Sequence, residues 1–480
     1  MPPHTDENAP ATTTTTAARP GAAVASAADR REEIVGASAA ALAAHGLRLE
    51  VLPTPARPDD GTDPKAADHP AQSRFAQAVE KGFYEKVPEG RALDQLLGCD
   101  ADDAKRSLGV YADGDDPAAR EPVGTFVDWE STLTVSPGVE LPAWLISNVT
   151  VSPGHRRRGI LRAMMTRSLA DAVEAGMPVA ALTVSESAIY GRFGFGVCCH
   201  ARRATVRTSG QVEMTAPAAP GTVTREDPRE VIDEVDALQR ELQLATPGSP
   251  RRPHAHRLIW NDSLASENDG RGDGTFAGLY RNAEGEARGA VLYRFKGWET
   301  EPPTVRVQAF MAADHEAWRG LLRYLFDLDL VERVEFSRLP DDGALQAALA
   351  NARLAKVTEH WDDLYLRILD VKACLEGRTY VPGVAGELVL AVEDRLGHAD
   401  GTWLLAVADG RARVERLDDA AAEDADLVLD VAALSGLWLG GTSAVTGART
   451  GAVREGTAGA AARLDALLTS AAPVHLLTGF

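Results

Sequence analysis

The sequence has few cysteines and no long apolar run. Four of its 480 residues are cysteines, and they are too few and too irregularly spaced for a disulfide framework or a zinc site. We therefore expect no metal, and a reducing compartment with the cytoplasm as the default. No window approaches 18 uninterrupted apolar residues, so no membrane-spanning helix is predicted.

Basic side chains are also in deficit. The chain carries 50 lysines and arginines against 70 aspartates and glutamates, which gives a formal net charge of -20 at pH 7. Such a charge disfavours general binding to nucleic acids or to anionic membranes, and it attracts cationic partners. We expect a cationic small molecule as ligand, and neither nucleic acid nor membrane as partner.

The length predicts about three domains at roughly 150 residues each. The composition, 45% hydrophobic and 25% charged, is that of a globular protein. Residues 1 to about 28 are rich in Pro, Thr and Ala without large apolar clusters, which predicts disorder, and they lack the pattern of a secretory signal. The next segment, 29–46, is alanine-rich and favours a helix that ends at Gly46.

Three units follow this extension. The first begins near Leu47 with an alternating strand, and then predicts a helix over 74–87, strands over 124–135 and 141–151, a helix over 159–175 and a strand over 178–184. The second begins near Thr222 with helical periodicity and repeats the order strand, turn, helix, strand. The third begins near Asp370, and its apolar residues around Trp438 are expected to be core, with a lipid pocket as the alternative.

The most informative stretch is a basic loop between a strand and a helix, with the sequence VTVSPGHRRRGILR over residues 149–162. The first amides of a helix have no internal partner, so arginines and a glycine at that place favour the binding of an anion. The loop lacks the GxxxxGK[ST] and GxGxxG patterns of other nucleotide sites. A diphosphate, as in a nucleotide or coenzyme A, is the expected ligand, and a solvated surface loop is the alternative.

Two motifs together match a known family. The run VTVSPGHRRRGILRA is followed, some 25 residues later, by SESAIYGRFGFG, and this pair resembles the enhanced intracellular survival (Eis) group of GNAT N-acetyltransferases. The resemblance implies a mixed α/β (α+β) fold of tandem GNAT-like domains, each a mixed central sheet flanked by helices, with a sterol-carrier-protein-like domain at the C-terminus. The implied boundaries are 1–46 for the extension, 47–215 for the catalytic domain with the acetyl-CoA site, 216–369 for a degenerate second copy and 370–480 for the carrier-like domain. A homohexamer is also implied.

The resemblance also assigns residues to acetyl-CoA. In GNAT enzymes the pantetheine arm makes backbone hydrogen bonds to a splayed strand, and the pyrophosphate lies on the following loop and helix start. Transferred to this chain, the strand residues are Val149 and Val151, the pyrophosphate residues are Arg156, Arg157, Gly159, Ile160 and Leu161, and Ser185 touches the cofactor near the catalytic tyrosine. The bulky Leu161 departs from the general GNAT loop in a way that the Eis-like group shares.

Acyl transfer to an amine needs a base for the ammonium proton and an acid for the departing thiolate. By resemblance Tyr190 is the general acid. The general base is the C-terminal carboxylate of the chain, carried here by Phe480, and burial would raise the pKa of such a carboxylate toward the working pH. Without the resemblance, a terminus is expected to fray, although the apolar ending after Pro473 favours docking.

The resemblance places the acceptor beside Phe83 and Glu85. Acidic and aromatic groups of this kind select cationic amines through charge and cation–π contact, and Eis-like enzymes acetylate aminoglycosides, lysine side chains and other amines. Gly479 departs from the acidic penultimate residue of some members. We therefore expect an acetyl-CoA-dependent N-acetyltransferase acting on primary amines of an aminoglycoside, a polyamine or a lysine-like amine. The alternatives are a lipid carrier and a coenzyme A sensor without turnover.

Overall fold

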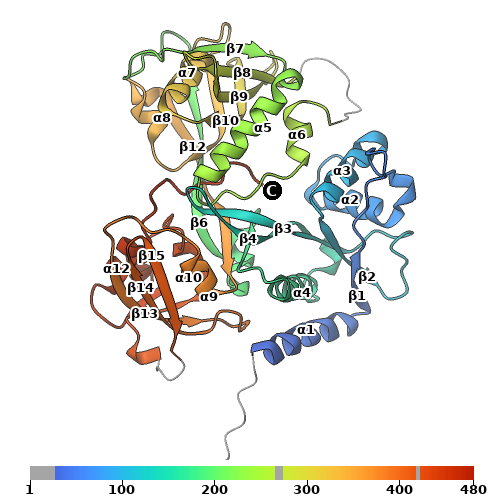
Figure 1. Cartoon of the computed structure of the whole chain (residues 1–480). Coiled ribbons are helices and arrows are strands. Elements are labelled where there is room, and N and C mark those ends of the chain that lie inside the picture. Colours follow the sequence, from blue (N-terminus) through green and yellow to red (C-terminus); the bar gives the residue numbers. More distant parts are fainter. Residues whose placement is uncertain (1–26, 265–273, 418–421) are drawn as a thin grey trace, which may run out of the picture.

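The computed structural model describes residues 27–264, 274–417 and 422–480. The disorder predicted for residues 1 to about 28 concerns a segment that, up to residue 26, lies outside the described residues. Three lobes surround the chain end, which lies at the centre of the molecule (Figure 1). Across the part of the chain that the structure describes, no helix combines the length and the apolarity that crossing a membrane requires.

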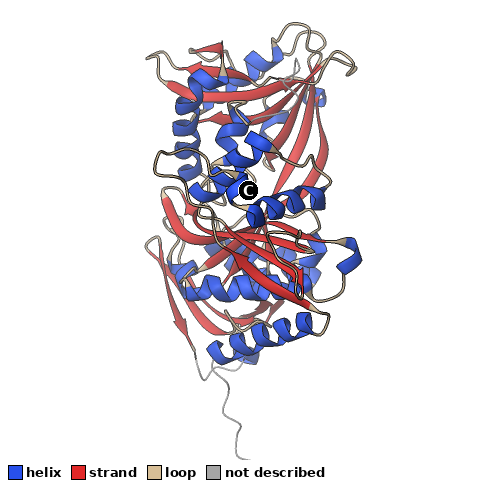
Figure 2. Cartoon of the chain, turned by 90° about the vertical axis from the view of Figure 1, so that its right-hand side faces the viewer, coloured by secondary structure: helices blue, strands red, loops and turns tan. Residues whose placement is uncertain are grey.

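A mixed sheet of twelve described strands runs through both larger lobes, in the order β1-β2-β3-β4-β5-β12-β6-β11-β10-β9-β8-β7. Figure 2 shows its strands between layers of helices. The strands are β1 (Leu47–Leu52), β2 (Arg106–Ala112), β3 (Gly124–Ser136), β4 (Val139–Val151), β5 (Val179–Leu182), β6 (Gly196–Arg207), β7 (Thr222–Glu226), β8 (Phe276–Arg281), β9 (Ala287–Phe295), β10 (Thr304–Ala312), β11 (Arg333–Pro340) and β12 (Ala355–Ile368).

Strands β6 and β12 join the two halves of this sheet. The last four residues of β12 pair with β5 of the first half, although β12 comes at the end of the second unit. In return, the C-terminal part of β6 pairs with β11 of the second half, and β6 and β12 pair with each other along nearly their whole lengths. Each half of the sheet is therefore completed by a strand from the other unit.

Helices cover both faces of the first half. They are α1 (Ala27–Ala43), α2 (Pro70–Phe83), α3 (Gly90–Asp102) and α4 (Ile160–Glu174). Side chains alternate across a strand, so Phe126 and Trp144 pack with α4 in one core, whereas Val127 and Leu145 pack with α2 in another. The alanine-rich segment forms α1 as predicted, and it lies along α4 with Leu42 buried.

The second half repeats this layering with different helices. Helices α5 (Pro228–Ala245) and α6 (Ala255–Trp260) pack on one face, and α7 (His315–Phe326) packs on the other. The short α8 (Ala344–Ala347) follows β11. The helical periodicity expected from Thr222 begins only after β7, because Asp227 caps the amide of Arg229 and Pro228 takes the first helical position.

The C-terminal domain has its own five-stranded sheet in the order β15-β14-β13-β16-β17. Its elements are α9 (Val371–Glu376), β13 (Gly386–Glu393), β14 (Gly401–Ala408), β15 (Arg411–Arg416), β16 (Leu427–Asp430), α10 (Val431–Leu437), α11 (Ala444–Thr450), β17 (Val453–Glu455) and α12 (Ala460–Leu468). Helix α10 packs on β6 and β12. A side chain at Gly196 would meet the backbone of Ala432 at 1.8 Å, so this close approach requires glycine.

A fully buried arginine ties the lobes together. Arg367 on β12 donates from Nη2 to both carboxylate oxygens of Asp394, at 2.8 and 2.7 Å, in the C-terminal domain. Its Nε donates to the carbonyl of Phe193 at 2.8 Å. Burial alone would raise the pKa of Asp394, but Arg367 and neighbouring backbone amides hold it below the ordinary value. The two charged groups therefore satisfy each other inside the core.

Removing one partner of this pair is expected to destabilise the whole chain. Arg367→Met would leave Asp394 buried and uncompensated, which costs about 3–5 kcal/mol in comparable buried pairs. Denaturant unfolding measures the loss. Arg413→Met is the matched control, because Arg413 is 82% exposed in its pair with Glu415 and such pairs contribute little. Equal stability of the two variants would contradict a structural role for Arg367.

Candidate active site

The cofactor strand predicted from the sequence is β4, and it diverges from β5. The two strands run parallel from Ala143 opposite Val179 to Ile146 opposite Leu182, where the pairing stops. Just beyond this point Asn148 adopts φ 54° and the register of β3 against β4 shifts. A bulge of this kind bends a strand, and residues 147–151 pair with β3 on one side while their pairing with β5 has ended.

The basic loop then leads into α4. Arg157 (φ 64°) and Gly159 (φ 79°) both have left-handed backbone conformations, and Gly159 is the N-cap of α4. Among the described residues, no hydrogen bond is donated by the backbone amides from Arg156 to Leu161. Arg156 and Arg157 are exposed. Free amides, a helix N-terminus and guanidinium groups thus lie together, and this combination suits a diphosphate.

Tyr190 lies between two short 3₁₀ turns, Ser187–Ile189 and Gly191–Phe193. It is 6% exposed and shares a core with α4, Val149 and Val151. Burial, followed by the nearby Glu186, raises the pKa of Tyr190 to about 12. The hydroxyl therefore keeps its proton throughout the neutral range. Ser185 is exposed on the loop that leads from β5 to these turns.

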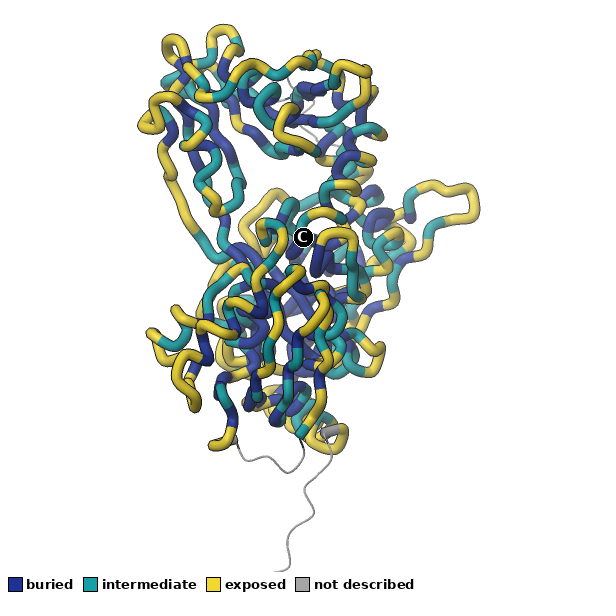
Figure 3. The backbone as a smooth tube through the Cα atoms, turned by 60° about the vertical axis from the view of Figure 1, so that its left-hand side comes forward, coloured by how far each residue is buried: buried dark blue, intermediate teal, exposed yellow. Residues whose placement is uncertain are grey.

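The last residues of the chain lie at the centre of the molecule (Figure 3), where they bind the loop that follows α5. The amide of His475 donates to the carbonyl of Pro247 at 2.9 Å. Ser249 Oγ donates to the carbonyl of His475 at 2.7 Å and accepts from the amide of Leu477 at 3.0 Å. Leu476 is fully buried. The terminus is therefore held in place by backbone bonds and does not fray.

Phe480 itself lies at the divergence of β4 and β5. Thr183, the first residue after β5, donates from Oγ1 to the main-chain oxygen of Phe480 at 3.3 Å. The Phe480 ring packs edge-on against Trp129, with 6.0 Å between ring centroids. Trp129 also faces Lys105, whose ammonium is 5.3 Å from the ring centroid. The main-chain oxygen of Phe480 thus lies beside the end of β5, next to the opening.

The two predicted acceptor residues lie at the end of α2. Helix α2 ends at Phe83, which is 40% exposed, and Glu85 follows in the next loop. Burial, followed by the nearby Glu85, raises the pKa of Glu80. Gly82 lies so close to β4 that an added side chain would meet Thr150 at 2.6 Å. The end of α2 therefore borders the cofactor strand on the face of Thr150.

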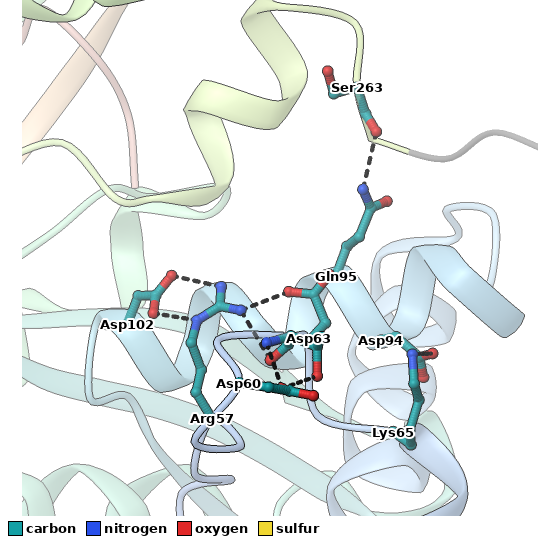
Figure 4. Close-up of polar contacts among 9 residues, drawn as sticks. Arg57, Asp60, Asp63, Lys65, Asp94, Gln95, Asp102 and Ser263 are labelled. Carbon is teal, nitrogen blue, oxygen red and sulfur yellow. Dashed lines mark hydrogen bonds and ion pairs between the residues drawn. The ribbon is translucent and has the colours of Figure 1, made fainter.

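Helix α3, the next element, bridges the two halves (Figure 4). Arg57 binds Asp102 at the end of α3 through Nη2 at 2.7 Å, and it binds Asp63 through Nη1 at 2.8 Å. At the other side Gln95 donates to the carbonyl of Ser263, beyond α6, at 3.0 Å. These hydrogen bonds and ion pairs hold α3 in place between the first and second halves of the molecule.

The predicted residues are divided between the two faces of the sheet. Val149, Val151, Ile160, Leu161 and Tyr190 share one core, and Phe480 lies on the opposite face of the sheet in contact with Thr183 and Trp129. The sequence alone did not predict the roles of Thr183 and Trp129 or the bulge at Asn148. An asparagine within a strand is the one local signal, because asparagine tolerates a positive φ. Over the described parts of the chain, no group of three or more metal-ligand side chains is found.

Three family models match the chain in the order of its units. An acetyltransferase (GNAT) domain matches residues 72–198, a second acetyltransferase (GNAT) domain matches residues 249–368, and a sterol carrier protein domain matches residues 371–476. The N-acetyltransferase Eis of Mycobacterium tuberculosis is 34% identical over 372 residues, which are 76% of this chain and 87% of that protein.

The chain belongs to the Eis-like family of GNAT N-acetyltransferases. An uncharacterized N-acetyltransferase of Streptomyces avermitilis is 38% identical over 431 residues, covering 87% of this chain and 98% of the relative. The crystal structure of Eis1 from Mycobacterium abscessus superposes with a TM-score of 0.71 at 26% identity, over 90% of this chain and all of that one. The predictions of tandem GNAT domains, a sterol-carrier-like third domain and N-acetyltransferase activity are confirmed.

The docked tail of this Eis-like chain is expected to loosen in acid. Burial, followed by the nearby Arg338, lowers the pKa of His475 to about 3, whereas the unfolded chain protonates histidine near pH 6.5. The unfolded state alone therefore takes up this proton, so the stability that is full above pH 6.5 falls as the pH drops toward 3. His475→Leu should reduce the fall in melting temperature between pH 7 and pH 5.

His45→Leu is the control for this experiment, because His45 is exposed on the far side of the first lobe. It should leave the pH dependence of the melting temperature as in the native chain. The half-buried His256 and His398 also have lowered pKa values, to about 4 and about 3, chiefly through desolvation, so His475→Leu removes only a part of the effect. An unchanged slope in His475→Leu would contradict the assignment.

Proposed function

We propose that this chain transfers the acetyl group of acetyl-CoA directly to a primary amine, with Tyr190 as general acid and the Phe480 carboxylate as general base. The observation that carries the proposal is the hydrogen bond from Thr183 to the main-chain oxygen of Phe480 at the divergence of β4 and β5. In a GNAT enzyme the thioester of acetyl-CoA lies at the opening beside the splayed strand. The Phe480 carboxylate would therefore be next to the thioester. The amine is one of the cationic classes expected from the sequence: aminoglycoside, polyamine or lysine-like amine.

The reaction balances with these two groups. The Phe480 carboxylate accepts one proton from the ammonium, and the freed amine nitrogen attacks the acetyl carbonyl carbon. The new C–N bond forms as the C–S bond breaks, and Tyr190 gives its proton to the leaving sulfur. The second proton of the attacking nitrogen and the proton held by the Phe480 carboxylate leave to solvent, from which Tyr190 regains its own. The high pKa of Tyr190 keeps the acid loaded at neutral pH.

Acetyl-CoA is held, in this proposal, by the backbone of Val149 and Val151 and by the loop that ends at Gly159. The unpaired amides from Arg156 to Leu161 face the pyrophosphate, and the side chains of Arg156 and Arg157 add charge. Ser185 borders the thioester end. The homohexamer, the cytoplasmic location and the domain boundaries at residues 46, 215 and 369 stay predictions.

The alternatives draw less support. A lipid carrier would need an open apolar tunnel in the third domain. The apolar residues considered for it are at most 5% exposed and pack into one core, namely Leu434, Leu437, Trp438 and Leu439. Trp438 even donates from its indole nitrogen to the carbonyl of Cys374 at 2.9 Å. A coenzyme A sensor that catalyses no acetyl transfer would not need the last residues of the chain to dock beside the cofactor strand.

The two acid–base groups are expected to affect turnover and not cofactor affinity. Tyr190→Phe, and separately a Gly-Ser extension after Phe480, should each lower kcat by about 10²–10⁴-fold, because each removes one proton-transfer group. Calorimetry should find the Kd of acetyl-CoA within about twofold of the native value. The same extension placed before residue 1 is the control. Native turnover with the C-terminal extension would refute the carboxylate role.

The basic loop is expected to govern cofactor affinity. Arg156→Ala removes charge-assisted contacts to phosphate that are worth about 1.5–3 kcal/mol, so the Kd of acetyl-CoA should rise roughly 10- to 150-fold. Arg411→Ala on β15, far from the loop, is the matched control and should leave the Kd unchanged. If Arg156→Ala binds acetyl-CoA as tightly as the control, the pyrophosphate lies elsewhere.

A further inference from the structure

The last three residues of the chain have few partners. Backbone hydrogen bonds hold the tail as far as Leu477. Over the described parts of the chain, residues 478–480 take part in one hydrogen bond, which Thr183 Oγ1 donates to the main-chain oxygen of Phe480 at 3.3 Å. This length exceeds the range of about 2.5–3.0 Å that is usual between two oxygens, so the bond is weak. The apolar packing of the Phe480 side chain must therefore do most of the holding.

The ring of Trp129 gives this packing a direction. Trp129 belongs to β3, the neighbour of β4, and it is 4% exposed. Its ring meets that of Phe480 edge-on, with 85° between the ring planes. Aromatic rings prefer such edge-to-face geometry, so the contact orients the Phe480 ring as well as attracting it. Because Phe480 is the terminal residue, the orientation of its side chain also decides where its carboxylate lies.

The Trp129 ring is itself held by a cation. The Lys105 side chain is 12% exposed, and its ammonium is 3.2 Å from a carboxylate oxygen of Asp100 and 3.4 Å from one of Asp103. The same ammonium is 5.3 Å from the centroid of the Trp129 ring. A cation near an aromatic ring attracts it more strongly when both are withdrawn from solvent. The two aspartates thus hold the ammonium, and the ammonium holds the indole ring.

Asp103 also ties this group to the second half of the molecule. Its carboxylate is 2.6 Å from Nδ1 of His254 and accepts from the backbone amide of the same residue at 3.1 Å. The loop ahead of His254 is the one that binds the tail. The two supports of the chain end, the backbone hydrogen bonds and the pair of Lys105 and Trp129, therefore meet on one segment.

We infer that Trp129 is a positioning residue for the Phe480 carboxylate, and that Lys105 positions Trp129. The inference rests on the proposed acetyl transfer, in which this carboxylate is the base. Neither side chain exchanges a proton with the substrate, because an indole has no basic group and the Lys105 ammonium is shared between two carboxylates. Both act by keeping the last residue at the end of β5.

Digestion from the C-terminus measures the position of Phe480 without turnover. Carboxypeptidase A removes a terminal phenylalanine when the chain end is released. Trp129→Leu should therefore lose phenylalanine at least about tenfold faster than the native chain, whereas Trp129→Phe, which keeps a ring, should stay within about threefold. Trp298→Leu is the matched control with the native rate, because Trp298 is 64% exposed and packs on Phe295. The native rate in Trp129→Leu would overturn the inference.

A double-substitution experiment tests whether Trp129 acts through Phe480. Trp129→Leu should lower kcat at least about tenfold, with the Kd of acetyl-CoA within about twofold of the native value. In the chain with a Gly-Ser extension after Phe480, the same substitution should change kcat by less than about twofold, because the base is already displaced. Equal losses in both chains would overturn the inference, since Trp129 would then act at another point of the reaction.

The two experiments separate this inference from the proposed function. Native turnover in the extended chain would refute the base and leave the protection of Phe480 by Trp129 standing. Rapid loss of phenylalanine from the native chain, with turnover of an amine, would overturn the positioning and leave acetyl transfer standing.

The role of Lys105 is tested by its charge. Lys105→Met should speed the loss of phenylalanine and lower kcat, each at least about threefold, whereas Lys105→Arg keeps a cation and should stay within about twofold of the native chain. Asp100 and Asp103 lose their partner in Lys105→Met, so circular dichroism checks its fold. Lys105→Gln, which can still donate to them, is the second uncharged variant and should behave as Lys105→Met. Native behaviour of the uncharged variants would overturn the role of Lys105.

Discussion

The buried pair of Arg367 and Asp394 is the contact on which the arrangement of the lobes depends. It joins the last strand of the large sheet to a loop of the C-terminal domain, and its third bond holds the carbonyl of Phe193, three residues after Tyr190. Gly194 leaves the space for the guanidinium, because an added side chain there would meet Arg367 Nε at 2.6 Å. Buried ion pairs add little net stability, but they penalise arrangements that leave a charge unpaired. The pair thus holds the C-terminal domain in one position against the large sheet. That position in turn determines where the last residues of the chain lie.

The sequence predicted the order of the units and the strand, loop and helix around the basic motif because their signals are local. Alternation and helical periodicity identified β1, β3, β4 and α4 within a few residues, and the two motifs identified the family. The helix expected over 74–87 lies instead at Pro70–Phe83, because Tyr84 takes a left-handed conformation that ends it. The strand exchange of β6 and β12, the contact of Thr183 with Phe480 and the docking of His475 on Ser249 join residues far apart in the chain. Such pairings leave no periodic trace in a sequence.

Two parallel strands diverge in each half of the sheet, β4 from β5 and β10 from β11, but the helices that follow them begin differently. In the first half an asparagine bulge and a glycine-capped helix leave backbone amides free beside the opening. In the second, Asp314 and Glu316 stand at the corresponding helix start. The two helix starts thus differ in their groups, with backbone amides that donate no hydrogen bond among the described residues in the first half and two carboxylates in the second.

The exchanged strands also set the order in which the molecule can fold during synthesis. Strand β5 is short, and all four of its residues are apolar and buried. One of its edges pairs with the end of β12, which leaves the ribosome about 180 residues later. At 5–20 residues per second this delay is roughly 10–40 s, during which an unpaired hydrophobic strand edge is open to association with other chains. We therefore expect the newly synthesised first half to need a chaperone until β12 is made. Each half of the sheet lacks a strand without the other unit, so neither half is expected to fold after transfer alone to another protein.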